Sequence, residues 1–383
     1  MSSSDNSRPA QPRLTKPPLG QRALRSIGWV LAGLVVLMLI WAGAQVALRR
    51  PRPTLLFTEA DLPKLPPPDE NGWQIVKNEI PSIGEPQRPD KEITEISDGK
   101  ATFDGRWSRA EGRAQKIADV ARDEKTKRWL ALIDKAAARP RFADACPMTF
   151  EPDCPRPLHL LALHQMQEAT VLDDALSQRW NDAFSRVVKM VHVDTEFLPS
   201  ARSTLTLAVA RAEVHRTVKL VDILLDGAAH EKEQGRGPDG AQLIRFARDI
   251  EPLFEKVHDE DMEPMRVVIA EYLFSVYAIE HLTDSAQGRL SRGSSILYDP
   301  NHTLEMLNER FEKYVAFARS DGAGEAPKFP SNRLWFLRNP YGHLLLEVTR
   351  GTLENHVPTM RKDRDLLMQD LGALHKRLKA LMN

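Results

Sequence analysis

The side chains with the clearest capacity for chemistry lie inside a stretch whose pattern is that of one long helix. Glu213 is flanked there by Arg211, His215 and Arg216. A carboxylic acid in a helical groove can act as a general acid, as an enzyme that cleaves wall polymers requires, but this chemistry needs a second placed carboxylate. No motif supplies one, so the pattern favours a buried or interhelical salt bridge, and an envelope hydrolase is the alternative.

Histidine and acidic residues also occur at spacings that invite comparison with metal sites. His159 and His164 are five residues apart, which turns them about 500° around a helix, whereas helical metal pairs are four apart. We interpret them as two unrelated polar-face histidines. The segments 192–196 (HVDTE) and 258–263 (HDEDME) carry more ligands. The first precedes a proline at a helix end, where charges are ordinarily solvated. The second lacks the calcium-loop order and is interpreted as a cap of the next helix.

The chain lacks the motifs of the large enzyme families. It contains no P-loop, dinucleotide-binding glycine motif, Gly-x-Ser-x-Gly elbow or cysteine–histidine nucleophile pattern. We therefore assign no catalytic, metal-binding or cofactor-binding residue and expect no cofactor. The 53 basic and 53 acidic residues are unevenly distributed, with a net charge of +6 over residues 1–68 and −6 over the remainder. An acidic bulk domain lacks the basic face that binds phosphates, so we expect no nucleic-acid partner.

Cys146 and Cys154 are the only cysteines and bracket the short segment CPMTFEPDC. An even, closely spaced pair suits an oxidising compartment, whereas a structural zinc site needs four ligands. The spacing predicts a disulfide between Cys146 and Cys154, and two reduced thiols are the alternative.

Residues 27–48, IGWVLAGLVVLMLIWAGAQVAL, form an apolar run without a charge. About 20 apolar residues cross the roughly 30 Å core of a bilayer as a helix. The run is longer than the apolar core of a cleaved signal peptide and ends in basic residues, so it predicts an uncleaved signal anchor. The lipid bilayer is then a partner through residues 27–48.

The flanking segments suggest an orientation. Residues 1–26 are rich in serine, proline and basic groups and predict a disordered, basic cytoplasmic tail. Five basic residues precede the span and four follow it, which favours a cytoplasmic N-terminus, as does the cysteine pair. We therefore expect a single-pass protein of the inner (cell) membrane with its bulk domain periplasmic or extracellular.

The remainder predicts an all-α fold. Residues 49–68 contain six prolines and predict a stiff linker that holds the domain off the membrane. Apolar residues at helical spacings predict helices over 155–176, 177–193, 203–225, 241–257, 263–282 and 303–319. Only residues 92–105 resemble a hairpin, and weakly. No fixed repeat period is found, so residues 69–383 are expected to form a helical extracytoplasmic domain, either an irregular bundle or a short α-solenoid.

The last predicted helix carries the most regular apolar pattern. Its seam positions alternate at spacings of four and three: Leu353, Val357, Met360, Arg364, Leu367, Leu371, Leu374, Leu378 and Leu381. Such a seam can form a coiled coil, or the helix can pack on its own domain. Both interpretations remain open from the sequence.

Two short stretches resemble landmarks of a group of single-span bacterial envelope proteins. One runs from Tyr298 to Leu304 (YDPNHTL) and the other from Arg338 to Leu345 (RNPYGHLL). The resemblance implies an N-terminal anchor followed by a helical body, and it implies no activity. Together these observations lead us to expect a membrane-anchored helical interaction or structural module of the bacterial envelope. Its partner would be an unknown envelope protein or a second copy of the chain.

Overall fold

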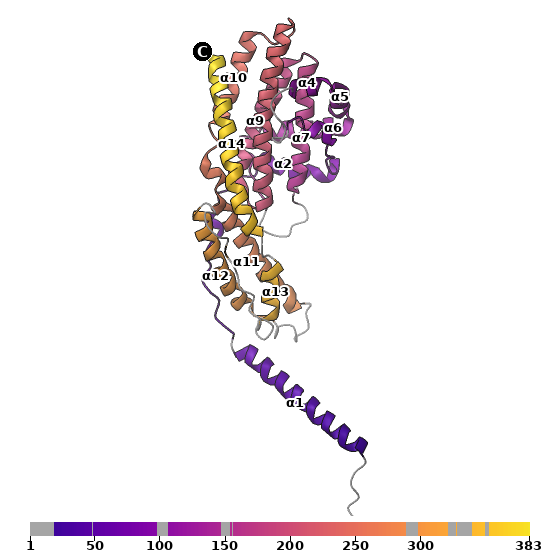
Figure 1. Ribbon diagram of the computed structural model, residues 1–383, viewed down its shortest axis with the longest axis vertical. Coiled ribbons are helices and arrows are strands. Elements are labelled where there is room, and N and C mark those ends of the chain that lie inside the picture. The colour runs from indigo at the N-terminus through magenta and orange to yellow at the C-terminus, as the bar shows by residue number, and fades with distance from the viewer. Residues whose placement is uncertain are drawn as a thin grey trace, which may run out of the picture.

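The computed structural model is helical throughout the residues that it describes, with no strand among them (Figure 1). These residues are 19–47, 49–97, 106–146, 154, 156–288, 298–320, 327, 339–348 and 352–383. The α-helices are α1 (Leu19–Ala47), α2 (Gly72–Ile83), α3 (Lys91–Thr94), α4 (Arg106–Glu111), α5 (Ala114–Arg122), α6 (Glu124–Ala137), α7 (Pro157–Leu176), α8 (Trp180–Phe197), α9 (Thr204–Glu233), α10 (Gly240–Phe254), α11 (Pro264–Gly288), α12 (Pro300–Arg319), α13 (Pro340–Val348) and α14 (Thr352–Met382). Short 3-10 turns are η1 (Glu59–Asp61), η2 (Leu198–Ser200) and η3 (Asp259–Met262).

Several helices begin at local sequence signals. Asp123, Ser203 and Asp299 are N-caps of α6, α9 and α12, and each side chain accepts a hydrogen bond from the backbone N–H three residues later. The six helices expected between residues 155 and 319 are present as α7 to α12. The expected hairpin at 92–105 is wrong where it is described, because Lys91–Thr94 form α3, and residues 98–105 lie outside the described residues.

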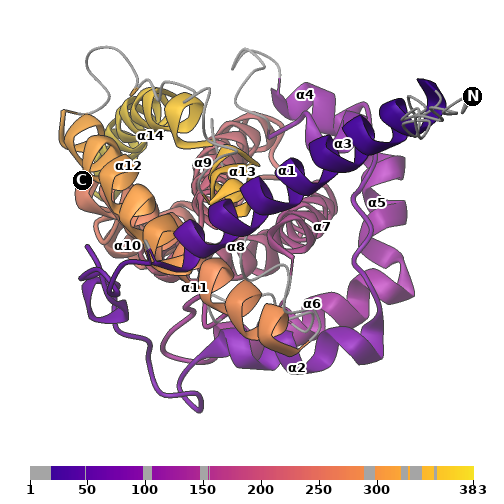
Figure 2. The same cartoon turned by 90° about the horizontal axis from the view of Figure 1, so that it is seen from below.

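Helix α9 is the centre of the body. It packs against α7, α8, α14, α4 and α11, so elements far apart in the sequence meet on it (Figure 1, Figure 2). Helices α2, α5 and α6 lie on the side of α7 and α8, while α10 packs on α8 and α14. At the other end of the body, α12 packs on α11 and α13 packs on α12. The hydrophobic core therefore runs along both faces of α9, which is buried over most of its length.

The C-terminal seam faces the chain's own core. Its buried members are Leu353, Val357, Met360, Leu367, Leu371, Leu374 and Leu378. Helix α14 packs along α10 and α9. Of the two interpretations left open by the heptad spacing, the structure therefore shows packing on the same domain. Pro358 lies inside α14, in its second turn.

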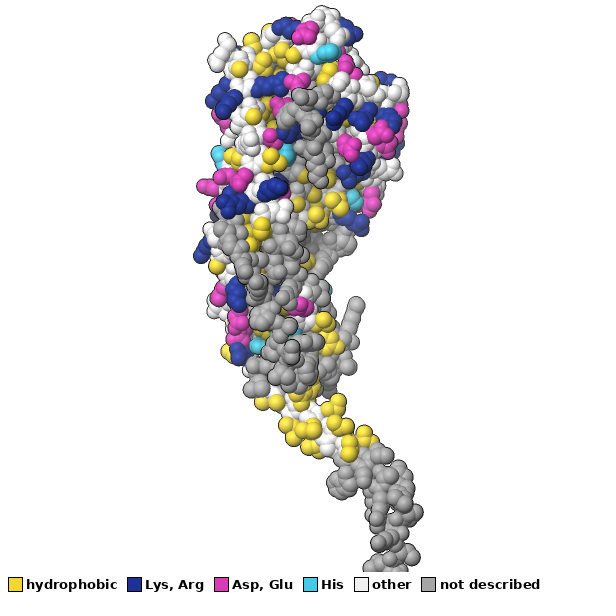
Figure 3. All heavy atoms as spheres, in the orientation of Figure 1, with side chains coloured by type: hydrophobic (Ala, Val, Ile, Leu, Met, Phe, Trp, Pro, Cys, Tyr) yellow, Lys and Arg dark blue, Asp and Glu magenta, His cyan; other side chains and the backbone are white. Residues whose placement is uncertain are grey.

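Helix α1 contains the apolar run and leaves the lower end of the body (Figure 1). Its side chains are described from Val30 onward, and they are largely hydrophobic and exposed (Figure 3). The prediction that residues 27–48 cross a membrane is not supported: in the described part of the chain, no helix has both the length and the apolar character that this requires.

The proline-rich segment after α1 differs from the expected spacer, because residues 50–58 lie along α11 and α12. We call these residues the strap. The Asn308 side chain donates to the backbone oxygen of Thr54 (2.8 Å), and the Leu56 N–H donates to the Tyr272 hydroxyl (3.0 Å). The Phe57 ring stacks edge-on against Tyr272, with centroids 5.6 Å apart. Prolines keep the strap extended, and these contacts fasten it to the body.

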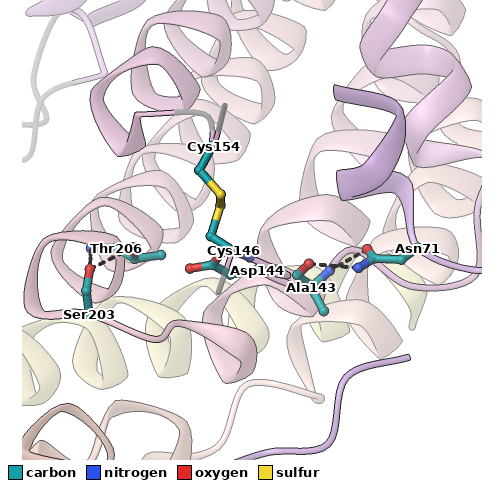
Figure 4. The surroundings of a disulfide bond; sticks show 7 residues. All are labelled: Asn71, Ala143, Asp144, Cys146, Cys154, Ser203 and Thr206. Carbon is teal, nitrogen blue, oxygen red and sulfur yellow. Dashed lines mark hydrogen bonds between the residues drawn. A yellow bond between two sulfur atoms is a disulfide. The ribbon is translucent and has the colours of Figure 1, made fainter. Parts of the chain in front are cut away.

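The predicted disulfide between Cys146 and Cys154 is confirmed, and its Cα atoms are 5.8 Å apart (Figure 4). It lies in the connection between α6 and α7. The chain is held at Cys146 because the Asp144 carboxylate accepts a hydrogen bond from its N–H (3.0 Å). Ala143, the residue before Asp144, exchanges two 2.9 Å hydrogen bonds with the Asn71 side-chain amide. The disulfide therefore extends an already anchored segment.

Replacing both cysteines, Cys146→Ser with Cys154→Ser, should lower the free energy of unfolding by about 2–3 kcal/mol, because a short loop loses its covalent closure in the unfolded state. Denaturant titration of the full chain in detergent would measure the loss. Mass spectrometry without reduction should show the native chain lighter by two hydrogens than the reduced chain. Free thiols in protein isolated from its native cells without reductant would contradict the prediction.

Candidate functional site

Ionisable side chains from three long helices meet inside the body. On α7, residues 164 and 168 are one turn apart, and on α9, residues 213 and 216 share a face, since positions three or four apart are neighbours on a helix. Helix α8 contributes one carboxylate. We call the buried set the charge cluster: His164, Glu168, Asp194, Glu213 and Arg216.

His164 joins α7 to both other helices. Its Nε2 lies 2.8 Å from the Thr217 hydroxyl and 3.2 Å from Asp194 Oδ2, and Thr217 itself donates to that oxygen. Its Nδ1 lies 3.1 Å from Glu168 Oε1 as an ion pair without hydrogen-bond geometry. Burial alone lowers the pKa of His164, but Asp194 and Glu168 more than offset it and raise the pKa to about 10. The ring is therefore a cation at neutral pH.

Glu168 and Arg216 form the second part of the charge cluster. The guanidinium donates to both carboxylate oxygens, with Nε 2.7 Å from Oε1. It also donates to the Thr94 carbonyl and to the Ser97 hydroxyl, each at 2.8 Å. Burial raises the pKa of Glu168, but Arg216 and His164 outweigh this effect and lower it to about 2. Glu168 is therefore ionised and well paired.

Glu213 is the exception in the charge cluster, since no residue that the structure describes donates a hydrogen bond to its carboxyl group. Its side chain is 4% exposed. Burial raises the pKa of Glu213 to about 8; His164 and Arg216 pull the value down, whereas Asp194 and Glu168 push it up. The cations His164 and Arg216 are already balanced by the carboxylates of Asp194 and Glu168. A negative charge on Glu213 would therefore have no cation to balance it. The carboxyl is therefore mainly neutral at pH 7.

Glu213 faces a small cavity that it shares with His164, Gln167 and Asp194. The volume is about 20 Å³, and the apolar lining comes from Ile133, Phe142, Leu160, Leu163 and Val193. A cavity of this size has room for about one water molecule. Asp194 is the second carboxylate that the sequence pattern did not place. The arrangement can therefore hold a proton and a water.

Glu213 itself forms no ion pair with any residue that the structure describes, so the salt bridge expected for it is wrong, but its neighbour Arg216 does form a buried interhelical salt bridge, with Glu168. Arg211 donates to the Met360 carbonyl (2.8 Å), and His215 Nε2 lies 2.9 Å from Asp370 Oδ2, so both tie α9 to α14. Successive residues on a helix point in different directions. Flanking charges in the sequence therefore said little about the partner of Glu213.

The other sequence candidates do not converge. In residues 192–196, Asp194 joins the charge cluster, whereas Glu196 pairs with Arg141 and Lys256, and His192 contacts a backbone carbonyl. His159 lies near Glu85. The expectation that His164 sits on a polar face is wrong, since it is buried. Within residues 258–263, Asp259–Met262 form η3, directly before α11.

Two other groups contain three potential metal ligands within reach of one another: Glu111, His230 and Glu231, and Glu251, Glu255 and His375. In each group a carboxylate is already paired with a cation. Glu231 pairs with Arg236, and Glu251 lies near Lys379. Both groups are therefore explained by ion pairs.

The signal for the charge cluster was present in the sequence but weak. His164 and Glu168 are four residues apart on α7, among the apolar residues Leu160, Leu163 and Leu172, and this helix is buried on nearly every face from Leu160 to Ala175. Polar residues in such a helix must be buried and must find partners. The partners Asp194 and Arg216, however, lie on other helices, and a single sequence does not identify them.

We expect the stability of the protein to depend on pH through Glu213. Below its ordinary pKa of 4.5 the carboxyl is neutral in both the folded and the unfolded chain. Between pH 4.5 and about 8 only the unfolded chain ionises, so stability falls as pH rises. Glu213→Gln removes this titration and should flatten the fall, measured by urea titration at several pH values. The exposed Glu309→Gln should retain the native slope. Equal slopes for Glu213→Gln and the native chain would contradict the assignment.

Comparisons with known proteins return no match, whether to family models, to curated proteins or to solved structures. The function must therefore be inferred from the chain itself. Its two most distinctive features are the buried charge cluster and the exposed apolar helix α1.

Proposed function

We propose that the protein is a single-pass, membrane-anchored helical module of the bacterial cell envelope that acts by binding a partner rather than by catalysis. In this proposal residues 27–48 cross the inner membrane, residues 1–26 are cytoplasmic, and the body is periplasmic or extracellular. The resemblance of YDPNHTL and RNPYGHLL to single-span envelope proteins supports the same arrangement.

The observation that carries the anchor is the exposure of α1. Its large apolar side chains are each more than half exposed: Val30, Leu31, Leu34, Val35, Val36, Leu37, Met38, Leu39 and Ile40. Seven consecutive residues, 34–40, span nearly two helical turns, so every face of this stretch is apolar. Burying apolar surface contributes about 25 cal/mol per Å², and water gives α1 none of that stabilisation. A bilayer supplies the missing apolar surroundings.

The confirmed disulfide supports placing the body outside the cytoplasm, because disulfides persist in oxidising compartments and are rare where thiols are kept reduced. The excess of basic residues before residue 27 supports the same orientation.

The charge cluster supports a non-enzymatic body. Four of its five members neutralise one another in two interlocked pairs, and the fifth faces a cavity of about one water. Such a network fixes the packing of α7, α8 and α9. An envelope hydrolase that uses Glu213 is the competing function, because a carboxyl with a raised pKa is also what a general acid requires.

Reporter fusions test the orientation. Alkaline phosphatase fused to the C-terminus should be active, and a cytosol-active reporter at the same position should be silent. The reverse pattern would overturn the proposed topology.

Glu213→Gln tests the hydrolase. A variant that folds normally and retains the cellular phenotype supports the binding module, whereas a folded variant without the phenotype supports the enzyme. Crosslinking in intact cells would then identify the partner, either an envelope protein or a second copy.

A further inference from the structure

The two sequence stretches that resemble envelope proteins each contain a turn, one at Asp299 and one at Asn339, and these turns lie against each other. Asn339, which precedes α13, accepts a hydrogen bond from the Asp299 N–H (2.8 Å) and donates to the Thr303 hydroxyl (2.8 Å) at the start of α12. Asn339 has a φ of 52°, a left-handed conformation that asparagine tolerates. A Cβ at Gly342 would collide with Thr303 and Asn339, so only glycine permits this approach. We call this arrangement the turn pair.

The turn pair is also bound to the base of the apolar helix. The Asn301 side chain donates to the Arg50 carbonyl (2.7 Å), and the Arg50 guanidinium pairs with Glu305 of α12. Arg50 is the third residue after the end of α1 at Ala47. The start of α13 is therefore fixed at the end of the body from which α1 leaves, as the two views show (Figure 1, Figure 2).

Helix α13 has apolar residues on two opposite faces. The inner face packs on α12 through the buried Gly342 and Leu346, which are four residues apart. The outer face presents Tyr341 and Leu344, three residues apart and 50% and 52% exposed. Glu347, which is exposed one turn beyond Leu344, is the charged residue of this face, so the apolar pair lies at the end of α13 next to the turn pair.

We propose that the Tyr341–Leu344 face of α13 inserts into the headgroup region of the bilayer that α1 crosses, as a second membrane contact. The inference rests on the proposed anchor. Tyrosine is favoured at the membrane–water interface, where its ring is apolar and its hydroxyl remains hydrated. The position beside Arg50 brings this face to the level of the chain's exit from the membrane. The lipid surface is thus the occupant that both the chemistry and the position favour.

Lipid quenching tests this contact in the full-length chain. Leu344→Cys is labelled with an environment-sensitive fluorophore, the native cysteines being closed in their disulfide, and reconstituted in vesicles of phosphatidylethanolamine and phosphatidylglycerol. Leu366→Cys is the matched control: Leu366 is 45% exposed and lies about 21 Å along α14 from Thr352 at 1.5 Å per residue. Thermal unfolding of both labelled proteins verifies that they fold.

Lipids with a spin label near the headgroup should quench the label at position 344 several-fold more than the label at 366, with a blue-shifted emission at 344 alone. Flotation of the same vesicles reports on α1 independently. Protein that floats but shows equal quenching at the two sites would overturn the α13 contact and leave the anchor intact; the face would then be solvated or bound by a protein. Protein that does not float would overturn both.

Discussion

The double substitution Leu371→Ala with Leu378→Ala is expected to unfold the body. Both leucines are buried in the contact of α14 with α10 and α9. Each Leu→Ala change in a packed core costs roughly 2–5 kcal/mol, so two together approach the roughly 5–15 kcal/mol that stabilises a typical domain. Denaturant titration followed by circular dichroism would show the midpoint collapse.

Leu366→Ala on the same helix is the control, because its side chain is largely exposed. It should shift the free energy of unfolding by less than about 0.5 kcal/mol. A double variant that stays folded with an unchanged midpoint would contradict the internal seam. A double variant that stays folded but changes from dimer to monomer in sedimentation would restore the coiled-coil interpretation.

Arg216→Met should be the most damaging single substitution in the charge cluster. It leaves Glu168 buried without the guanidinium that donates to both its oxygens, and it frees the Thr94 carbonyl. Removing one partner of a buried ion pair typically costs about 3–5 kcal/mol. The loss should be smaller in acid, because Arg216 is the main group that offsets the effect of burial on the pKa of Glu168, and without it the carboxyl would take up a proton more readily.

Two further variants separate this effect from general damage. Lys189→Met removes an exposed pair with Asp134 (2.8 Å) and should cost at most about 1 kcal/mol. Adding Glu168→Leu to Arg216→Met removes both charges and should recover part of the stability, since replacing a whole buried pair by apolar groups is far less costly than breaking it. No recovery in the double variant would mean that packing, rather than charge, explains the loss.

The helices and the disulfide could be predicted from sequence because both are local properties. Periodic apolar residues define α7 to α12 within short windows, and Cys146 lies only eight residues from Cys154. The seam of α14 was also visible, although its spacing alone did not decide whether the surface it meets belongs to the same chain.

The candidate site was largely hidden because its contacts join residues far apart in the sequence. His164 meets Asp194 and Thr217, and Arg216 reaches back to Ser97. The strap was misjudged for the same reason: prolines explain why it is extended, but Tyr272 and Asn308 decide where it lies. The spacing of apolar residues along a helix indicates which of its faces is buried. It does not indicate which side chain of another helix will contact that face.

The strap has a mechanical consequence. A free proline-rich linker would let the body reorient relative to α1. A strap hydrogen-bonded to α11 and α12 leaves the body little freedom to do so. Helix α14 begins part-way along the body, beyond α13, and runs to the marked C-terminus at the far end, and its 31 residues extend roughly 46 Å at 1.5 Å each (Figure 1). With α1 in a bilayer, the strap would hold the far end of the body at a fixed distance from the membrane. A partner that binds the far end would have to lie at that distance.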